Sequence, residues 1–175
     1  NAHPVIRVMS GSTHAPFDFT IDNHPSGYTI DYIKLLTKRL GLEIEFINGS
    51  LPEHIKHIKN KNIDLMHGLA QMPATLQNAV NYSPVYKTTL NALIGRTGAE
   101  HITSLDDLQN LTIALLKEDS FAHQLEQKIG DIDILFFDNS QAMLKAVAFG
   151  RADVAKVELP VASHLIRQLF LTNLT

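Results

Sequence analysis

Segments that favour strands and segments that favour helices alternate along this chain of 175 residues, and the alternation limits the folds open to it. In the first half, strand and helix signals follow one another at residues 5–9, 30–40, 43–47, 50–59 and 63–66. Ser50 and Glu53 have the spacing of a capping box, which marks the start of the second helix. This order predicts βαβ units around a mainly parallel sheet.

The second half of the chain repeats this plan. After a short capped helix, strands and helices alternate, and the expected elements are residues 104–108, 111–116, 121–129, 133–137, 141–149, 152–157 and 160–170. Residues 59–65 and 149–154 echo each other, since each joins a helix end, a basic turn and an Asp to a strand. Two similar halves predict two α/β lobes, 1–95 and 96–175, that face a cleft. A single doubly wound domain explains the pattern equally well.

Charge and composition exclude several partners. The chain has 15 basic and 18 acidic residues, a net charge of −3 and no basic stripe, so nucleic acid is not an expected partner. It has no cysteine, which rules out disulfides and thiolate metal sites. No apolar run approaches the ~20 residues that span a bilayer. Any contact with a membrane is therefore expected through segments outside this sequence.

Short motifs in a fixed order carry a family resemblance. They are Arg-Val-Met at 7–9, His-Ala-Pro-Phe at 14–17, Gly-Tyr-Thr-Ile-Asp at 27–31, Gly-Leu-Glu-Ile-Glu-Phe at 41–46, Tyr-Ser-Pro-Val-Tyr at 82–86, Ser-Leu-Asp-Asp-Leu at 104–108 and Phe-Gly-Arg-Ala-Asp at 149–153. This succession resembles the polar-amino-acid type of periplasmic solute-binding proteins, family 3. It is most similar to the extracytoplasmic sensor domains of membrane histidine kinases and diguanylate cyclases.

The resemblance implies a periplasmic-binding-protein-like α/β fold of type II, in which two lobes close by a hinge on a ligand cleft. It also implies a periplasmic or other extracytoplasmic location. In the family the chain returns from the second lobe to the first, whereas this sequence ends at Thr175, after the last expected helix. The domain is therefore expected to be truncated at its C-terminus, with the segment that closes the first lobe absent.

Loops of the first lobe contact the ligand in this family. The resemblance assigns that role to His14, Phe17, Gly68, Ala70, Gln71 and Thr75. His14 takes the place of an aromatic ring that stacks on the ligand. Thr75 takes the place of an arginine whose planar fork grips a ligand carboxylate, and a threonine cannot supply that fork. The departure at Thr75 argues against α-amino acids bound in the family's usual geometry.

From the second lobe, the resemblance assigns ligand contacts to Ser120, Phe121 and Glu158. The family's anion-binding turn is similar to residues 117–121, where Ser120 opens a helix whose free N–H groups favour an anion. The acids at positions 118 and 119 oppose that role.

Glu158 takes the place of the family's ammonium-binding acid, so a small polar solute with a cationic group fits this position. An amine, a neutral polar molecule or no ligand at all are the open alternatives. Glu158 also suits a purely structural role, as the cap of the helix that begins near Pro160.

Nine histidines raise the question of metal binding. His54 and His57 are three residues apart on an expected helix, a spacing that can place two ligands on one face. That helix is expected to be solvated and no third ligand is evident, so neither a metal nor a cofactor is predicted. His67 is expected to be an ordinary, partly buried histidine, although His14 and His67 could instead respond to pH.

Three functions suit these features. The preferred hypothesis is a ligand-binding sensor module of a transmembrane signalling protein. Such a module tolerates an altered cleft, because its output is a change of conformational state. It could also dimerise through the parent protein. The alternative is a soluble binding protein of an ABC transporter for amino acids or amines, which would need the clamp that Thr75 lacks. An enzyme is not expected, since the sequence has no G-x-S-x-G, Walker or H-E-x-x-H motif.

Overall fold

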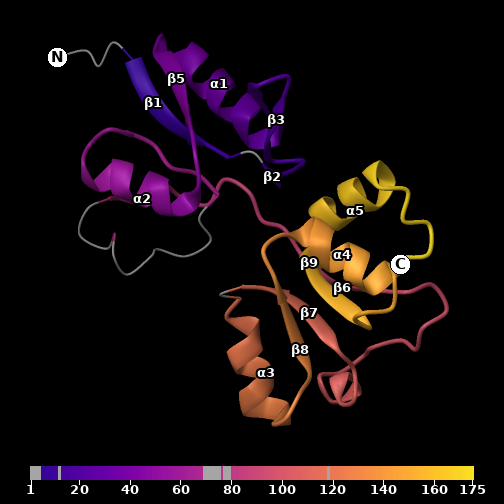
Figure 1. Cartoon of the computed structure of the whole chain (residues 1–175). Coiled ribbons are helices and arrows are strands. Elements are labelled where there is room, and N and C mark those ends of the chain that lie inside the picture. Colours follow the sequence, from indigo (N-terminus) through magenta and orange to yellow (C-terminus); the bar gives the residue numbers. More distant parts are fainter. Residues whose placement is uncertain (1–4, 12, 69–75, 77–79, 118) are drawn as a thin grey trace. The chain divides into compact units, whose positions relative to one another are not determined.

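The chain forms two compact units, residues 1–86 and 87–175 (Figure 1). The computed structural model describes residues 5–11, 13–68, 76, 80–117 and 119–175. The division falls earlier than the expected boundary after residue 95, because strand β6 (Asn91–Gly95) pairs with β9 (Val154–Glu158) in the second unit. Within the described ranges, no helix is both long and apolar enough to cross a bilayer.

The first unit is built on two parallel strands with helices after each of them. Its elements in chain order are β1 (Val5–Ser10), β2 (Thr13–His14), β3 (Asp18–Ile21), β4 (His24–Ser26), α1 (Tyr28–Leu40), β5 (Glu43–Asn48) and α2 (Leu51–Lys59). β1 and β5 pair along their whole length. α1 ends at Gly41, whose left-handed backbone (φ 67°) closes the helix. α2 opens at Ser50, whose N–H and hydroxyl both donate to the Glu53 carboxylate at 2.7 Å. Both predicted helix ends are confirmed.

The predicted strand at 63–66 is reduced to a single bridge between Leu65 and Val8. A side chain explains the difference. The Asp64 carboxylate accepts the backbone N–H of Arg7 at 2.9 Å and also binds the Arg7 guanidinium at 2.8 Å. A longer strand would need that N–H group for backbone pairing. The Leu65 carbonyl still accepts the N–H of Met9 at 3.0 Å, so the segment lies alongside β1.

Residues 13–26 form a small antiparallel sheet that the sequence pattern did not predict. β3 pairs with β2 on one side and with β4 on the other. Asp22 and Asn23 both have positive φ (49° and 62°) and make the tight turn between β3 and β4, in the backbone conformation that suits two-residue hairpins. The Asp-Asn pair was the signal for the hairpin.

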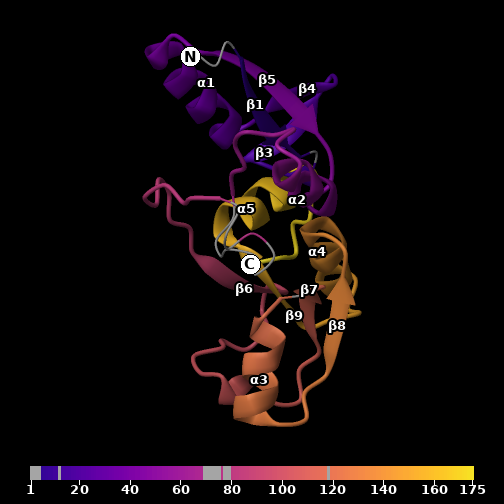
Figure 2. The same cartoon turned by 90° about the vertical axis from the view of Figure 1, so that its left-hand side faces the viewer.

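The second unit is a four-stranded sheet in the order β6–β9–β7–β8 (Figure 2). Besides β6 and β9, its elements are a 3₁₀ helix (Asp106–Leu108), β7 (Ile113–Leu116), α3 (Phe121–Ile129), β8 (Ile134–Phe137), α4 (Ser140–Ala148) and α5 (Leu159–Gln168). β7 is parallel to β8 and β9, as the alternation of strands and helices predicted, whereas β6 is antiparallel to β9.

Helices cover both faces of this sheet, which holds the strand ends in place. Ile113 and Leu115 of β7 are fully buried and pack in a cluster with Leu125 of α3. Ala114 lies between them, points to the other face and is also fully buried, and α4 contacts β7 (Figure 1). The carboxyl ends of parallel strands meet at one edge of a sheet, the edge where α/β folds bind ligands. In this unit those ends lie at Leu116, Phe137 and Glu158.

Candidate ligand-binding site

Two predicted ligand residues of the first unit, His14 and Phe17, follow β1 in the chain. The ring centre of His14, in β2, is 5.5 Å from that of Phe17, so the structure brings these two residues together. His14 is exposed, whereas Phe17 is 7% exposed and belongs to the core. Phe17 also donates its N–H to the carbonyl of His14 at 2.9 Å. His14 is thus accessible to a solute, and Phe17 supports its ring from the core.

The loop expected to grip the ligand lies mostly outside the described residues. Ala70, Gln71 and Thr75 fall within 69–75, so their roles stay predictions. Gly68, just before this stretch, is exposed and has a positive φ of 72°. That backbone conformation favours glycine, because a Cβ atom would strain it.

A buried acid–histidine pair next to His14 was not predicted. Asp18 is 4% exposed and the side chain of His67 is 7% exposed. His67 Nε2 lies 3.4 Å from Asp18 Oδ2 and 2.9 Å from the carbonyl oxygen of Met9. A carbonyl only accepts hydrogen bonds, so Nε2 carries the hydrogen of this imidazole. Asp18 Oδ2 also accepts the N–H of Gly11 at 2.5 Å.

Burial moves the pKa values of this pair in opposite directions. It raises the pKa of Asp18 to about 6, against the opposing effects of the Gly11 N–H and of His14. It lowers the pKa of His67 to about 4, and the hydrogen bond to the Met9 carbonyl offsets only part of that shift. At neutral pH the pair is therefore a carboxylate beside a neutral imidazole.

Two buried oxygens add to this cluster. Ser10 Oγ and Asp18 Oδ1 are closed to solvent and have no hydrogen-bond partner among the residues that the structure describes. An unsatisfied buried polar atom costs about 1–3 kcal/mol. A water or a polar atom of a solute bound here would relieve that cost.

In the second unit, the predicted anion-binding turn at 117–121 holds a carboxylate of the chain itself. Phe121, the first residue of α3, donates its N–H to Asp119 Oδ1 at 2.9 Å. Lys156 Nζ, from β9, binds Asp119 Oδ1 at 3.0 Å and Oδ2 at 2.8 Å. Ser120 precedes the helix, yet its hydroxyl makes no capping bond. Asp119 rather than Ser120 therefore supplies the polar group at this helix end, and one N–H group on which the prediction relied is already bonded.

Glu158 ends β9 and occupies the N-cap position of α5 without making a side-chain capping bond. Its side chain therefore makes none of the hydrogen bonds of a helix cap, the structural alternative to ligand binding. Its Oε2 atom is closed to solvent. Burial lowers the pKa of Lys87, and the attraction of the Glu158 carboxylate offsets part of that shift. A cationic solute at Glu158 would share the carboxylate with this lysine.

A third acid–lysine pair lies at the same edge of the sheet, where Lys117 Nζ is 2.6 Å from Asp138 Oδ1 after β7 and β8. We call three pairs the edge pairs: Lys117–Asp138, Lys156–Asp119 and Lys87–Glu158. Their lysines were not predicted as part of the site. For Lys156 the signal was available, because it lies two residues before Glu158 in a strand and so points to the same face.

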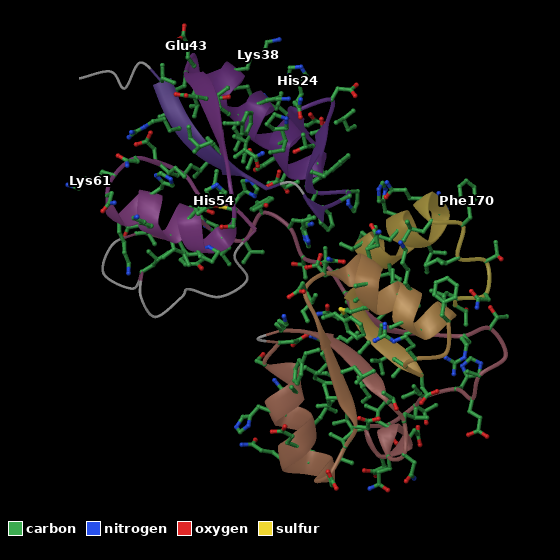
Figure 3. All side chains as sticks on the ribbon, in the orientation of Figure 1. His24, Lys38, Glu43, His54, Lys61 and Phe170 are labelled. Carbon is green, nitrogen blue, oxygen red and sulfur yellow. The ribbon has the colours of Figure 1, made fainter. Side chains whose placement is uncertain are left out.

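The structure places one of the two histidines of α2 in the interior. His54, labelled in Figure 3, is 1% exposed, and its Nε2 lies 3.0 Å from the carbonyl oxygen of Ile47. The expectation of a solvated helix is therefore wrong at His54, which faces the interior. In the part of the chain that the structure describes, no three His, Cys, Asp or Glu side chains come together as potential metal ligands.

Comparison with known proteins bears on the whole chain. Residues 6–156 match the family described as bacterial extracellular solute-binding proteins, family 3. The virulence sensor protein BvgS of Bordetella bronchiseptica is 25% identical over 170 residues, which cover 96% of this chain and 14% of BvgS. The chain thus spans only a small part of that relative.

Solved structures agree with the predicted fold. A histidine kinase sensor domain similar to periplasmic binding proteins superposes with a TM-score of 0.83 at 22% identity, covering 99% of this chain and 76% of the other. An ancestral arginine-binding protein bound to arginine gives 0.79 at 23% identity, covering 99% and 78%. These likenesses confirm the periplasmic-binding-protein-like fold, and the match over residues 6–156 shows that this chain belongs to the bacterial extracellular solute-binding proteins, family 3.

Proposed function

We propose that this chain is an extracytoplasmic ligand-binding sensor module within a larger transmembrane signalling protein. The observation that carries the proposal is the likeness of nearly the whole chain to one short segment of a long sensor protein. Members of the family are extracellular, which agrees with the expected extracytoplasmic location. Dimerisation through the parent protein stays a prediction.

The alternative is a soluble binding protein that delivers its solute to an ABC transporter. The likeness to an arginine-binding protein favours it. The two functions differ in the parent gene: a sensor module continues into a membrane-spanning segment and a cytoplasmic output domain, whereas a transport receptor does neither.

The module acts by binding and not by catalysis, with a small polar solute as its ligand. We assign solute contacts to His14, Phe17, Gly68, Ala70, Gln71 and Thr75 of the first unit and to Ser120, Phe121 and Glu158 of the second. The accessible ring of His14 supports the first group, and the position of Glu158 at the carboxyl end of β9 supports the second. Because Lys87 neighbours Glu158, a neutral or weakly basic polar solute suits this carboxylate better than a strongly basic one.

A thermal-shift screen tests this proposal. A solute that binds only the folded protein raises its free energy of unfolding by RT ln(1 + [L]/Kd), so weak binders are visible at about 10 mM. The panel contains L-glutamine, L-arginine, putrescine, ethanolamine and sodium sulfate. We expect a neutral or weakly basic compound to raise the Tm, and Glu158→Ala to weaken that compound's binding about tenfold or more, since a charge-assisted hydrogen bond is lost.

Glu126→Ala is the matched control, because Glu126 is an exposed acid on α3 of the same unit. It should leave the shift unchanged. An equal loss of the Tm shift in Glu158→Ala and Glu126→Ala would contradict a specific role for Glu158. A panel without any shift would count against solute binding as the function.

A further inference from the structure

The N-terminus of α3 is already bonded to an acid that lies just before it. Asp119 Oδ1 accepts the N–H of Phe121 at 2.9 Å, and the Asp119 carbonyl accepts the N–H of Ala122 at 3.1 Å. The first N–H groups of a helix have no partner within the helix, which makes such an end favourable for a bound anion. In α3, Asp119 takes up two of these groups.

A lysine from a distant part of the chain completes the arrangement. Lys156 Nζ binds both carboxylate oxygens of Asp119, and the two side chains are only 21% and 15% exposed. Its ammonium group also lies 5.2 Å from the ring centre of Phe121, within the range of a cation–π contact. Lys156 is thus held over the first turn of α3 by contacts with two of its residues.

Helix capping alone does not account for Lys156. An acid before a helix stabilises the first turn without help from a lysine. Here the lysine comes from β9 and lies two residues before Glu158, on the same face of the strand. A lysine and a helix N-terminus aimed at one carboxylate are the groups with which a protein binds an anionic ligand. In this chain the carboxylate belongs to Asp119.

We propose that Asp119 is an internal anion that fills the anion-binding position formed by Lys156 and the N-terminus of α3. This unit therefore excludes solutes that would place a carboxylate, sulfate or phosphate group there, and its ligand is uncharged or cationic at this end. The inference rests on the proposed solute-binding function and defines its specificity. Asp119 and Lys156 are then specificity-determining residues, although neither needs to touch the solute.

Removal of the internal anion should open the position. In Asp119→Ala, Lys156 and the Phe121 N–H lose their partner, and we expect sodium sulfate to bind at least about tenfold more tightly than to the wild type at low ionic strength. Calorimetric titration gives the affinity. The backbone amide signal of Phe121, followed by NMR, places the ion at α3. The double variant Asp119→Ala/Lys156→Met should lose the gain, because the cation is gone.

Asp138→Ala is the matched control, because it also removes the acid partner of a lysine at the same edge of the sheet, in a pair that is 62% and 76% exposed. It should gain no sulfate binding. If Asp119→Ala does not fold, Asp119→Asn replaces it, since an asparagine keeps an oxygen for the Phe121 N–H while removing the charge. A smaller gain in sulfate affinity is then expected.

Wild-type protein that binds sulfate as tightly as the Asp119 variant overturns the proposal, as does a folded Asp119 variant without any gain. The readout uses no natural solute. A wild type that binds nothing in the solute screen would count against the proposed function and leave this inference standing.

Discussion

Asp18 and His67 are two titratable side chains that meet in the interior of the first unit, and their protonation has opposite effects on the stability of the fold. The pKa of Asp18 is raised to about 6, so its contribution to stability is complete below pH ~4 and is lost as the pH rises through 6. The pKa of His67 is lowered to about 4, so its contribution is complete above pH ~6.5 and is lost as the pH falls through 4. In the wild type the two effects largely cancel over this range.

Single substitutions should separate the two effects. Asp18→Asn removes the acid's titration, so the stability of this variant relative to wild type should rise as the pH increases from 4 to 6.5. His67→Gln keeps an N–H donor for the Met9 carbonyl but does not titrate, so its relative stability should fall over the same interval. Urea denaturation at half-unit pH steps measures both.

Gln124→Ala, at an exposed position of the second unit, is the control and should follow the wild-type pH profile, because it changes no titratable group. Parallel profiles for Asp18→Asn and His67→Gln would show that burial does not perturb the pair as described.

Single residues were predicted well where they belong to a local motif and poorly where their partner is remote in sequence. Ser50 and Glu53 are three residues apart and form the capping box that their spacing predicted. Burial raises the pKa of Asp18, and its neighbour His67 is remote in sequence, so a local pattern reveals neither. Asp119 likewise meets Lys156 only because the sheet brings β9 to the start of α3.

At the scale of elements, α4 is a helix whose first turn depends on one side chain. Asn139, its N-cap residue, accepts the N–H of Ala142 through its side-chain oxygen at 2.9 Å. Asn139→Ala removes that acceptor and should destabilise the second unit by about 1 kcal/mol, which lowers its Tm by roughly 4–8 °C. Differential scanning calorimetry measures the change.

The control for this substitution is Gln141→Ala, in the exposed part of the same first turn. Alanine favours helices at least as much as glutamine, so the Tm should stay the same or rise slightly. An equal loss in both variants would mean that the Asn139 cap adds nothing.

Elements that carry their own periodic pattern of apolar residues were predicted from the sequence. Elements whose position depends on a turn or on the edge of a sheet were not. α1, α3, α4 and β5 carry their own pattern of apolar residues, and their predicted positions agree with the structure within two residues at each end. β2, β3 and β6 are short, and β6 is a strand only because β9 offers it an edge. The failed strand at 63–66 depends on Asp64, whose bond to the Arg7 N–H no periodicity encodes.

At the scale of the whole molecule, the second unit has the contacts of an independently folding domain. Its core cluster of Leu108, Ile113, Leu115, Leu125 and Val154 lies entirely within it. Gly95 and Thr175 exchange two backbone hydrogen bonds of 3.0 Å, which tie the end of β6 to the end of the chain. The boundary at residue 87 thus keeps β6 with the sheet that it completes.

A fragment of residues 87–175 should therefore fold alone and unfold cooperatively, as followed by circular dichroism. A fragment of residues 96–175, cut at the boundary that the sequence predicted, lacks β6 and should be less stable by at least about 10 °C in Tm. Equal stability of the two fragments would place β6 outside the folding unit.

The edge pairs also determine how the second unit encounters a charged molecule in solution. In two of them the charges lie 2.6 Å and 2.8 Å apart. That separation is well inside the Debye length of ~8 Å at physiological salt. Opposite charges so close together leave little field beyond the surface, so these pairs cannot steer ions by the long-range attraction that accelerates binding in clefts of one sign. The two close pairs therefore add little dependence on ionic strength to the rate at which a solute is captured at this edge.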